Sequence, residues 1–136
     1  MALYNAKNAA VWWRLIIPAE KAEKGGKMAK HEFAIMQNPP QSGKRYDTYE
    51  PKKYHCISVD DDYLEDIVGN FRHIGCYWHT LDVREKGIAY SGITLIPPCS
   101  IIAFIEVITN IPELSELKEL LEKAQKENKW IIHFGL

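Results

Sequence analysis

The chain has 136 residues and a mass of 15.7 kDa, the size of one ordinary domain. Apolar residues make up 46% of the sequence and charged residues 26%, which excludes a wholly disordered protein. The formal net charge of −1 excludes a strongly basic protein that would bind nucleic acid through bulk charge alone. We therefore expect a single domain over residues 1–136, and the predicted elements below make it α+β.

The charge is divided unevenly along the chain. Residues 1–53 carry ten Lys/Arg against five Asp/Glu, whereas residues 54–136 carry seven against thirteen. Such a division is typical of a protein with a partner-binding face. Two solvated elements that neutralise each other through space would give the same pattern, so the sequence leaves both interpretations open.

The first half of the chain predicts three strands around a long loop. β-Branched and aromatic residues predict strands over 11–17 and 31–37, which can pair as a hairpin across a turn or short helix at 19–30. Three prolines and a glycine predict an irregular loop over 38–53, and loops of this length are often functional or disordered. A short strand is predicted over 54–59.

A helix is predicted next, at residues 63–73. One face at helical spacing is formed by Leu64, Ile67, Val68 and Phe71. Asp60 or Ser58 is expected to cap its first turn, and Gly75 is expected to end it in the left-handed conformation.

The second half of the chain predicts a hairpin, two helices and a terminal strand. Strands over 76–83 and 88–96 are expected to pair across a short turn that ends in glycine. Residues 100–109 favour a helix slightly over a buried strand, and 112–127 predict a helix that buries Leu114, Leu117, Leu121 and Ala124. The apolar segment 130–136 predicts a strand inside the sheet or in an interface, and on that ground we expect a homodimer.

The predicted hairpin contains the first candidate site. Pairing Val83 with Ile88 would place His79 opposite Gly92, with Tyr77 and Tyr90 on the same face. These three side chains are the candidates for a ligand-binding or catalytic hollow. The alternative is that Gly92 simply allows an aromatic side chain from another element to pack closely.

The long loop is the second candidate site. Cations alternate there with aromatic rings, a combination that suits phosphates and stacked bases. The residues are Lys44, Arg45, Tyr46, Tyr49, Lys52 and Lys53. They predict a phosphate-bearing ligand, although exposed loops are often basic without a specific ligand, and the complete phosphate-loop motif is absent from the sequence.

Metal sites are not expected. His55, Cys56, His73, Cys76 and His79 are the candidate zinc ligands. Cys76 and His79 would point to opposite faces of a strand, His73 is expected at a helix end, and the usual Cys-x2-Cys pair is absent from the sequence. The acidic residues around Asp60–Asp62 fan around a first helical turn, which favours capping over Mg²⁺ or Ca²⁺ binding.

The residues together predict an α+β fold with a mixed or antiparallel sheet of five or six strands and two or three helices. No catalytic signature motif occurs, so we expect a non-enzymatic binding or inhibitor protein, of the immunity or antagonist type, that acts on a macromolecule. The alternative is a protein or enzyme that binds a small, nucleotide-like molecule through the His79 face. Three cysteines and the absence of a signal sequence or apolar span predict a cytoplasmic protein without a cofactor or a membrane partner.

Overall fold

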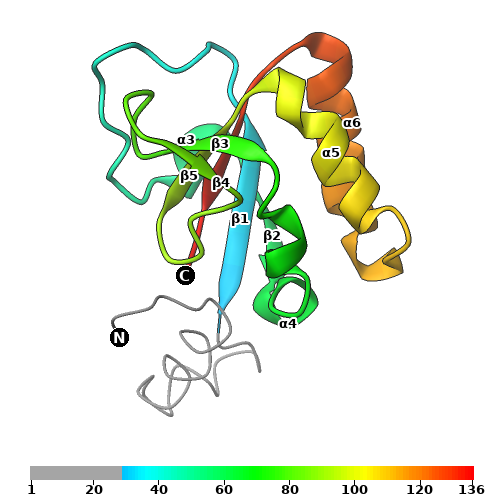
Figure 1. Ribbon diagram of the computed structural model, residues 1–136. Coiled ribbons are helices and arrows are strands. Elements are labelled where there is room, and N and C mark those ends of the chain that lie inside the picture. The colour runs from blue at the N-terminus through cyan, green and yellow to red at the C-terminus, as the bar shows by residue number, and fades with distance from the viewer. Residues whose placement is uncertain (1–28) are drawn as a thin grey trace.

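The computed structural model describes residues 29–136, which form a six-stranded antiparallel sheet with helices (Figure 1). The strand order is β2-β1-β6-β5-β3-β4. The strands are β1 (Lys30–Ile35), β2 (Ile57–Asp60), β3 (Gly75–Trp78), β4 (Arg84–Lys86), β5 (Ile93–Ile96) and β6 (Ile131–Phe134). The helices are α3 (Pro51–Tyr54), α4 (Asp61–Leu64), α5 (Pro98–Ile108) and α6 (Ser115–Glu127), with 3₁₀ turns η1 (Val68–Phe71) and η2 (Pro112–Leu114).

This arrangement confirms the predicted α+β fold with an antiparallel sheet. β1 confirms the strand predicted over 31–37. The strand predicted over 11–17, and its pairing with the strand at 31–37, lie outside the described residues.

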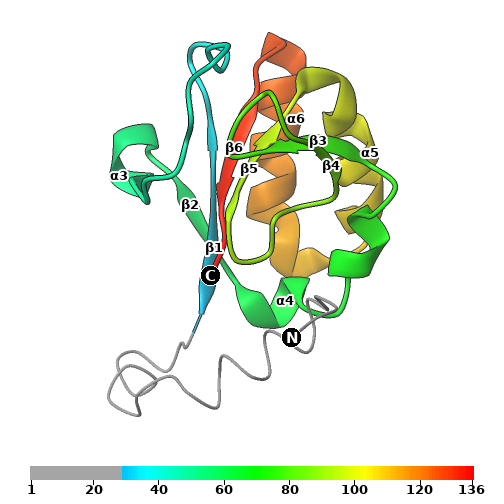
Figure 2. The ribbon, with the colours of Figure 1, turned by 60° about the vertical axis from the view of Figure 1, so that its left-hand side comes forward.

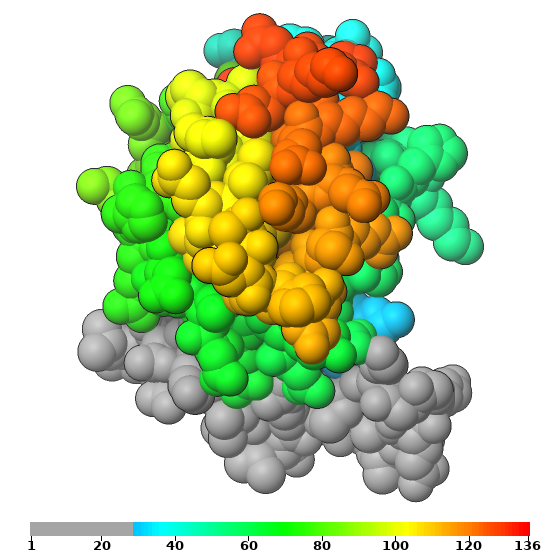
Figure 3. Space-filling view, turned by 90° about the vertical axis from the view of Figure 1, so that its right-hand side faces the viewer, coloured from blue at the N-terminus to red at the C-terminus, as the bar shows by residue number. Residues whose placement is uncertain are grey.

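The two faces of the sheet are covered differently. Helices α5 and α6 lie side by side over one face, whereas the loop after β1 and helix α3 lie on the other side (Figures 2 and 3). Because side chains alternate along a strand, Phe33 and Ile35 of β1 join the core beneath the helices, while Ala34 joins the cluster on the loop side. The loop therefore covers an apolar sheet surface.

The two long helices follow the predicted apolar patterns. Residues 100–108 lie in α5, and Thr109 is its C-cap, so the structure confirms a helix here and not a strand. The helix begins at Pro98, and proline is favoured in a first helical turn. Residues 112–127 form η2 and α6. The predicted buried stripe is confirmed, with exposures of 3% or less for Leu114, Leu117, Leu121 and Ala124.

The C-terminal strand lies in the middle of the sheet. β6 pairs with β1 on one side and with β5 on the other, and all four of its residues are buried. Beyond it, the Gly135 and Leu136 amides donate to the carbonyls of Gly92 and Tyr90. The apolar segment on which we based the homodimer is thus covered within one chain, and the reason for expecting a homodimer disappears.

The prediction of one continuous helix over 63–73 was wrong. The structure has α4 and then the tighter turn η1, with i→i−3 hydrogen bonds at Ile67 and Asn70. Gly69 and Asn70, which both favour the α-helix poorly, lie within η1. The inward residues Leu64 and Phe71 are nevertheless buried, so the apolar spacing identified the right face.

Two predictions about the ends of that helix were also wrong. Asp60 stands at the N-cap position of α4, but its side chain makes no capping hydrogen bond there. Gly75 does not end a helix in the left-handed conformation; it is the first residue of β3.

The predicted hairpin was wrong in its turn. The chain reverses at residues 79–83, where the Val83 amide donates to the Thr80 carbonyl. The segment predicted as the turn instead contains β4, so β3 is paired with β4 on one side and with β5 on the other. Tyr77 lies opposite Leu95, one residue away from the predicted register.

The loop and the strand after it differ slightly from the prediction. Pro51, the last of the three loop prolines, occupies the first turn of the short helix α3 rather than irregular chain. Tyr54 belongs to α3, and strand β2 begins only at Ile57. In the part of the chain that the structure describes, no helix is long and apolar enough to cross a membrane.

Candidate functional site: two grooves beside helix α3

Helix α3 stands at the centre of the loop face. It is a single turn that ends at His55, whose φ of 60° is left-handed and whose amide donates to the Pro51 carbonyl. A non-glycine residue in this conformation is uncommon, although histidine tolerates it better than most. The turn separates two surface grooves, and His55 lines both of them.

The first groove lies between α3 and the loop that follows β1. Its volume is about 280 Å³. Lys44 of the loop and Lys53 of α3 both line it, and the buried Met36 contributes apolar surface. Amide side chains of Gln37, Asn38 and Gln41 also line it. The groove thus offers cations, hydrogen-bond donors and an apolar surface together.

The second groove lies on the other side of α3. Its volume is about 440 Å³, and Lys52 and Tyr49 line it together with Glu32 of β1. The Tyr49 hydroxyl donates a hydrogen bond to the Glu32 carboxylate, while the residue as a whole remains 63% exposed. Burial of the hydroxyl and this bond raise the pKa of Tyr49 to about 12, so the phenol stays neutral.

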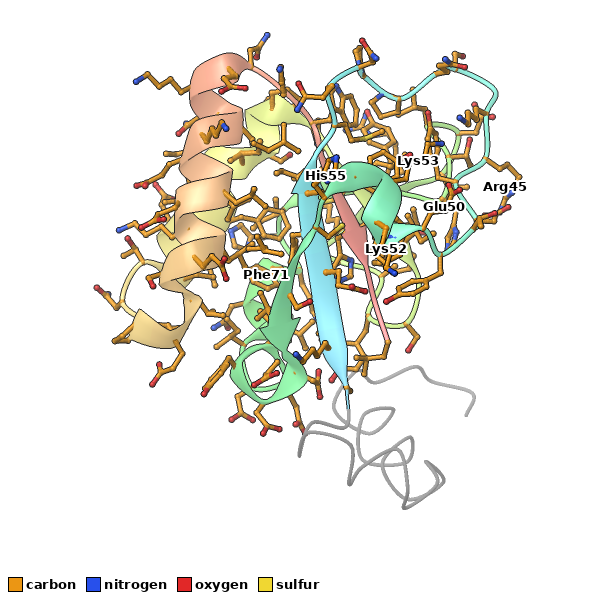
Figure 4. All side chains as sticks on the ribbon, turned by 180° about the vertical axis from the view of Figure 1, so that it is seen from behind. Arg45, Glu50, Lys52, Lys53, His55 and Phe71 are labelled. Atoms are coloured by element: carbon orange, nitrogen blue, oxygen red, sulfur yellow. The ribbon has the colours of Figure 1, made fainter. Side chains whose placement is uncertain are left out.

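The cations of the loop are not equivalent. Figure 4 shows Lys52, Lys53 and His55 around α3, with Arg45 farther out on the loop. Arg45 donates two hydrogen bonds to Asp47, of 2.7 and 3.2 Å, and this pairing lowers the pKa of the Asp47 carboxyl. The Arg45 charge is therefore largely matched within the loop.

The lysines are held more loosely. The Lys44 ammonium lies 5.0 Å from the centre of the Tyr46 ring. Lys53 lies 5.6 Å from the centre of the Tyr54 ring and 3.8 Å from a Glu50 oxygen, an exposed pair of little energetic value. Both ammonium groups can turn toward an anion in the first groove.

The two predicted stacking tyrosines have different environments. Tyr46 is buried, with 8% exposed, and its hydroxyl accepts a hydrogen bond from the Gln41 amide. It anchors the loop on the sheet and leaves little of its ring exposed to a ligand. Tyr49 is the exposed aromatic of this surface, and its ring meets Phe134 edge-on.

His79 fastens the loop to the sheet. Its Nε2 accepts a hydrogen bond of 3.3 Å from the Ile93 amide, which leaves Nδ1 to carry the proton. Nδ1 lies 3.2 Å from the Tyr46 carbonyl and 2.9 Å from an Asp47 oxygen. The Tyr46 amide also donates to the His79 carbonyl. His79 therefore positions the loop instead of lining a hollow.

Gly92 makes the His79 position possible, so Gly92→Ala is expected to loosen the loop. An added Cβ would lie 2.7 Å from His79 Nε2 and 3.2 Å from the Ala89 Cβ. The imidazole would have to leave its bonds to Ile93 and Tyr46. We expect faster hydrogen exchange of the Tyr46 amide; unchanged protection of that amide would contradict this role for His79.

The second cluster of titratable groups is buried beneath the helices. His31, Thr94 and His133 come from three neighbouring strands, Asp61 begins α4, and Tyr90 lies in the loop before β5. Each is at most 2% exposed. His31 Nε2 lies 3.0 Å from Asp61 Oδ1, and the Tyr90 hydroxyl donates to the same oxygen.

One assignment of protons satisfies this cluster with both imidazoles neutral. His31 Nε2–H donates to Asp61, and His133 Nε2–H donates to His31 Nδ1 at 2.9 Å. The Thr94 hydroxyl donates to His133 Nδ1 at 3.0 Å, and the Ala89 amide donates to the Thr94 oxygen at 2.7 Å. Burial and the neighbouring His31 hold the pKa of His133 well below its usual range, which favours this neutral form.

The structure separates the three residues of the predicted His79 hollow. Tyr90 belongs to the buried cluster, and Tyr77 packs against Trp130, with ring centres 5.7 Å apart. His79 does lie against Gly92, as the sequence predicted, but its ring is engaged by the loop.

Sequence reasoning missed His31, Asp61 and His133 as a group. One signal was present: His133 interrupts the apolar run of β6, and a buried polar side chain requires a partner. Which partner it finds depends on the order of the strands.

The candidate zinc ligands do not gather. Within residues 29–136, no three His, Cys, Asp or Glu side chains are placed to hold a metal ion. All three cysteines are free, and burial raises the pKa values of Cys56 and Cys76 to about 12, so neither thiol ionises near neutrality.

Comparison with known proteins adds no family to this description. No protein-family model, curated protein or solved structure matches the chain significantly.

Proposed function

We propose that this chain is a non-enzymatic binding protein that occupies a phosphate-bearing macromolecule through the grooves beside α3. One observation carries the proposal: Lys44 and Lys53 face a common groove that also offers amide side chains and an apolar surface. Proteins that bind nucleotides or single strands combine basic side chains that contact the phosphates with a surface on which the bases can stack.

Two further observations favour binding over catalysis. The imidazole–carboxylate pair suited to general-base chemistry, His31 with Asp61, is buried among hydrogen-bonded neighbours. The Cys56 thiol beside the second groove stays protonated, so it is a poor nucleophile. The free cysteines agree with a reducing cytoplasm, which we propose as its location.

The salt dependence of binding tests this proposal. We expect a fluorescein-labelled oligothymidylate of eight residues to bind at low salt, with an affinity that falls as salt rises, because condensed cations are released. Lys44→Gln with Lys53→Gln should reduce the slope of log K against log salt by about 1.4, at about 0.7 per contact with a single strand.

Matched variants distinguish binding at this site from non-specific attraction to surface charge. Arg45→Gln should change the slope less, because Asp47 already pairs with Arg45. Lys123→Gln with Lys126→Gln removes two exposed charges from α6, on the opposite face of the sheet, and should leave binding unchanged. Absence of detectable binding at low salt, or equal losses in all variants, would overturn the proposal.

A further inference from the structure

The two grooves repeat one set of chemical groups. The first groove has Lys53 and Tyr54, the second has Lys52 and Tyr49, and His55 lines both. Lys52 and Lys53 are consecutive residues of one helical turn, so their side chains diverge by about 100°, and each lines a different groove. A cation and a ring therefore occur twice, on either side of a shared imidazole.

A ligand that fits this repeat has a negative charge and a flat ring in each unit. We propose that the two grooves bind successive nucleotides of one single-stranded nucleic acid, which crosses α3 at His55. The inference rests on the proposed function and adds the class of ligand, a strand rather than a mononucleotide. DNA and RNA strands share the recognised chemistry, and the test includes both.

The two grooves differ in a way that predicts the order of binding. Glu32 places a carboxylate in the second groove, which repels a phosphate from its wall and offers an acceptor to a base amino group. The first groove has two lysines on its walls. A mononucleotide therefore prefers the first groove, and the second is filled only by a longer strand that is already held.

Tyr49 is the stacking surface of the second groove. Its ring is exposed, while its hydroxyl is fixed by Glu32 and its edge by Phe134. A ring held in this way loses little conformational freedom when a base stacks on it. Stacking on one aromatic side chain changes affinity by about 5- to 150-fold.

A length series tests the inference. Thymidine monophosphate, its dimer, tetramer and octamer, the matching uridylates, and inorganic polyphosphate of eight units would be titrated at low salt by calorimetry. We expect the affinity to rise about tenfold or more from the monomer to the dimer or tetramer. Polyphosphate should bind more weakly than the octamer of nucleotides.

The variants assign each groove. Lys52→Gln and Tyr49→Leu should weaken the binding of the oligomers and leave the binding of the monomer unchanged. Lys53→Gln should weaken the binding of both. Lys123→Gln on α6 is the control for loss of one charge, and circular dichroism would check that each variant is folded.

Three results would overturn the inference. These are a monomer that binds as tightly as the oligomers, a Lys52→Gln effect on the monomer equal to that on the octamer, and polyphosphate binding equal to that of the octamer. Each leaves phosphate binding at the first groove standing. Failure of every probe to bind would overturn the proposed function as well, so the two failures are distinguishable.

Discussion

His133→Leu is expected to lower the free energy of unfolding by about 2–6 kcal/mol. The substitution leaves two buried polar groups without the His133 imidazole as a hydrogen-bond partner, and each such loss costs about 1–3 kcal/mol. These groups are His31 Nδ1 and the Thr94 hydroxyl. Leucine is close to histidine in volume, so the loss would come from hydrogen bonding more than from a cavity. Urea denaturation followed by circular dichroism would measure it.

Variants of Thr94 provide the matched control. Thr94→Ser keeps the hydroxyl that joins Ala89 to His133 and should cost little, whereas Thr94→Val keeps the shape and removes the hydroxyl. Valine should therefore be the more destabilising of the two. Two results would show that the buried cluster contributes no stability through its hydrogen bonds. One is an equal urea midpoint for wild type and His133→Leu, and the other is a Thr94→Ser variant that is less stable than Thr94→Val.

The same variant should change the response to acid. Burial and His31 hold the pKa of folded His133 well below 6.5, so below that pH the unfolded chain binds a proton that the folded chain does not. The contribution of the His133 imidazole to the free energy of unfolding thus falls by about 1.4 kcal/mol for each pH unit below 6.5, until the pH reaches the pKa of His133 in the folded protein. The stability difference between wild type and His133→Leu should shrink from pH 7.5 to pH 5, and a constant difference would contradict the buried neutral imidazole.

Leu117→Ala is expected to destabilise the protein by about 2–5 kcal/mol. Leu117 is 3% exposed and lies in the core between α6 and the sheet, where a cavity would be left. Calorimetric or urea unfolding would measure the loss.

Ile102 of α5 is the control for this substitution. It is 46% exposed, so Ile102→Ala should change the free energy of unfolding by about 0.5 kcal/mol or less. An unchanged denaturation midpoint and slope for Leu117→Ala would remove Leu117 from the core.

Much of the helical layer could be predicted from local pattern. In α6, apolar residues at helical spacing face the sheet and charged residues face solvent, so the periodicity alone predicts which face is buried. The same spacing located Leu64 and Phe71 even where the helix itself was interrupted.

The candidate site was predictable in composition but not in arrangement. Lys44, Lys52 and Lys53 do line grooves, as a basic loop next to aromatic residues suggested. Nothing in the local sequence indicates that Asp47 pairs with Arg45 and His79, or that Tyr46 turns inward. Those outcomes depend on the sheet beneath the loop.

The sequence by itself determined the class of fold, the positions of β1, α6 and β6 and the basic character of the loop, because propensity and periodicity act over a few neighbouring residues. At α5 it only favoured a helix over a buried strand, and the structure decided between them. Only the tertiary structure decided that β6 lies between β1 and β5. That placement covers the apolar C-terminal strand and brings His133 into contact with His31, 102 positions away in sequence. Strand order depends on contacts between distant segments, and a one-residue change of register would turn His133 to the other face. For that reason the buried cluster, the role of His79 and the paired grooves emerge only once the sheet is assembled.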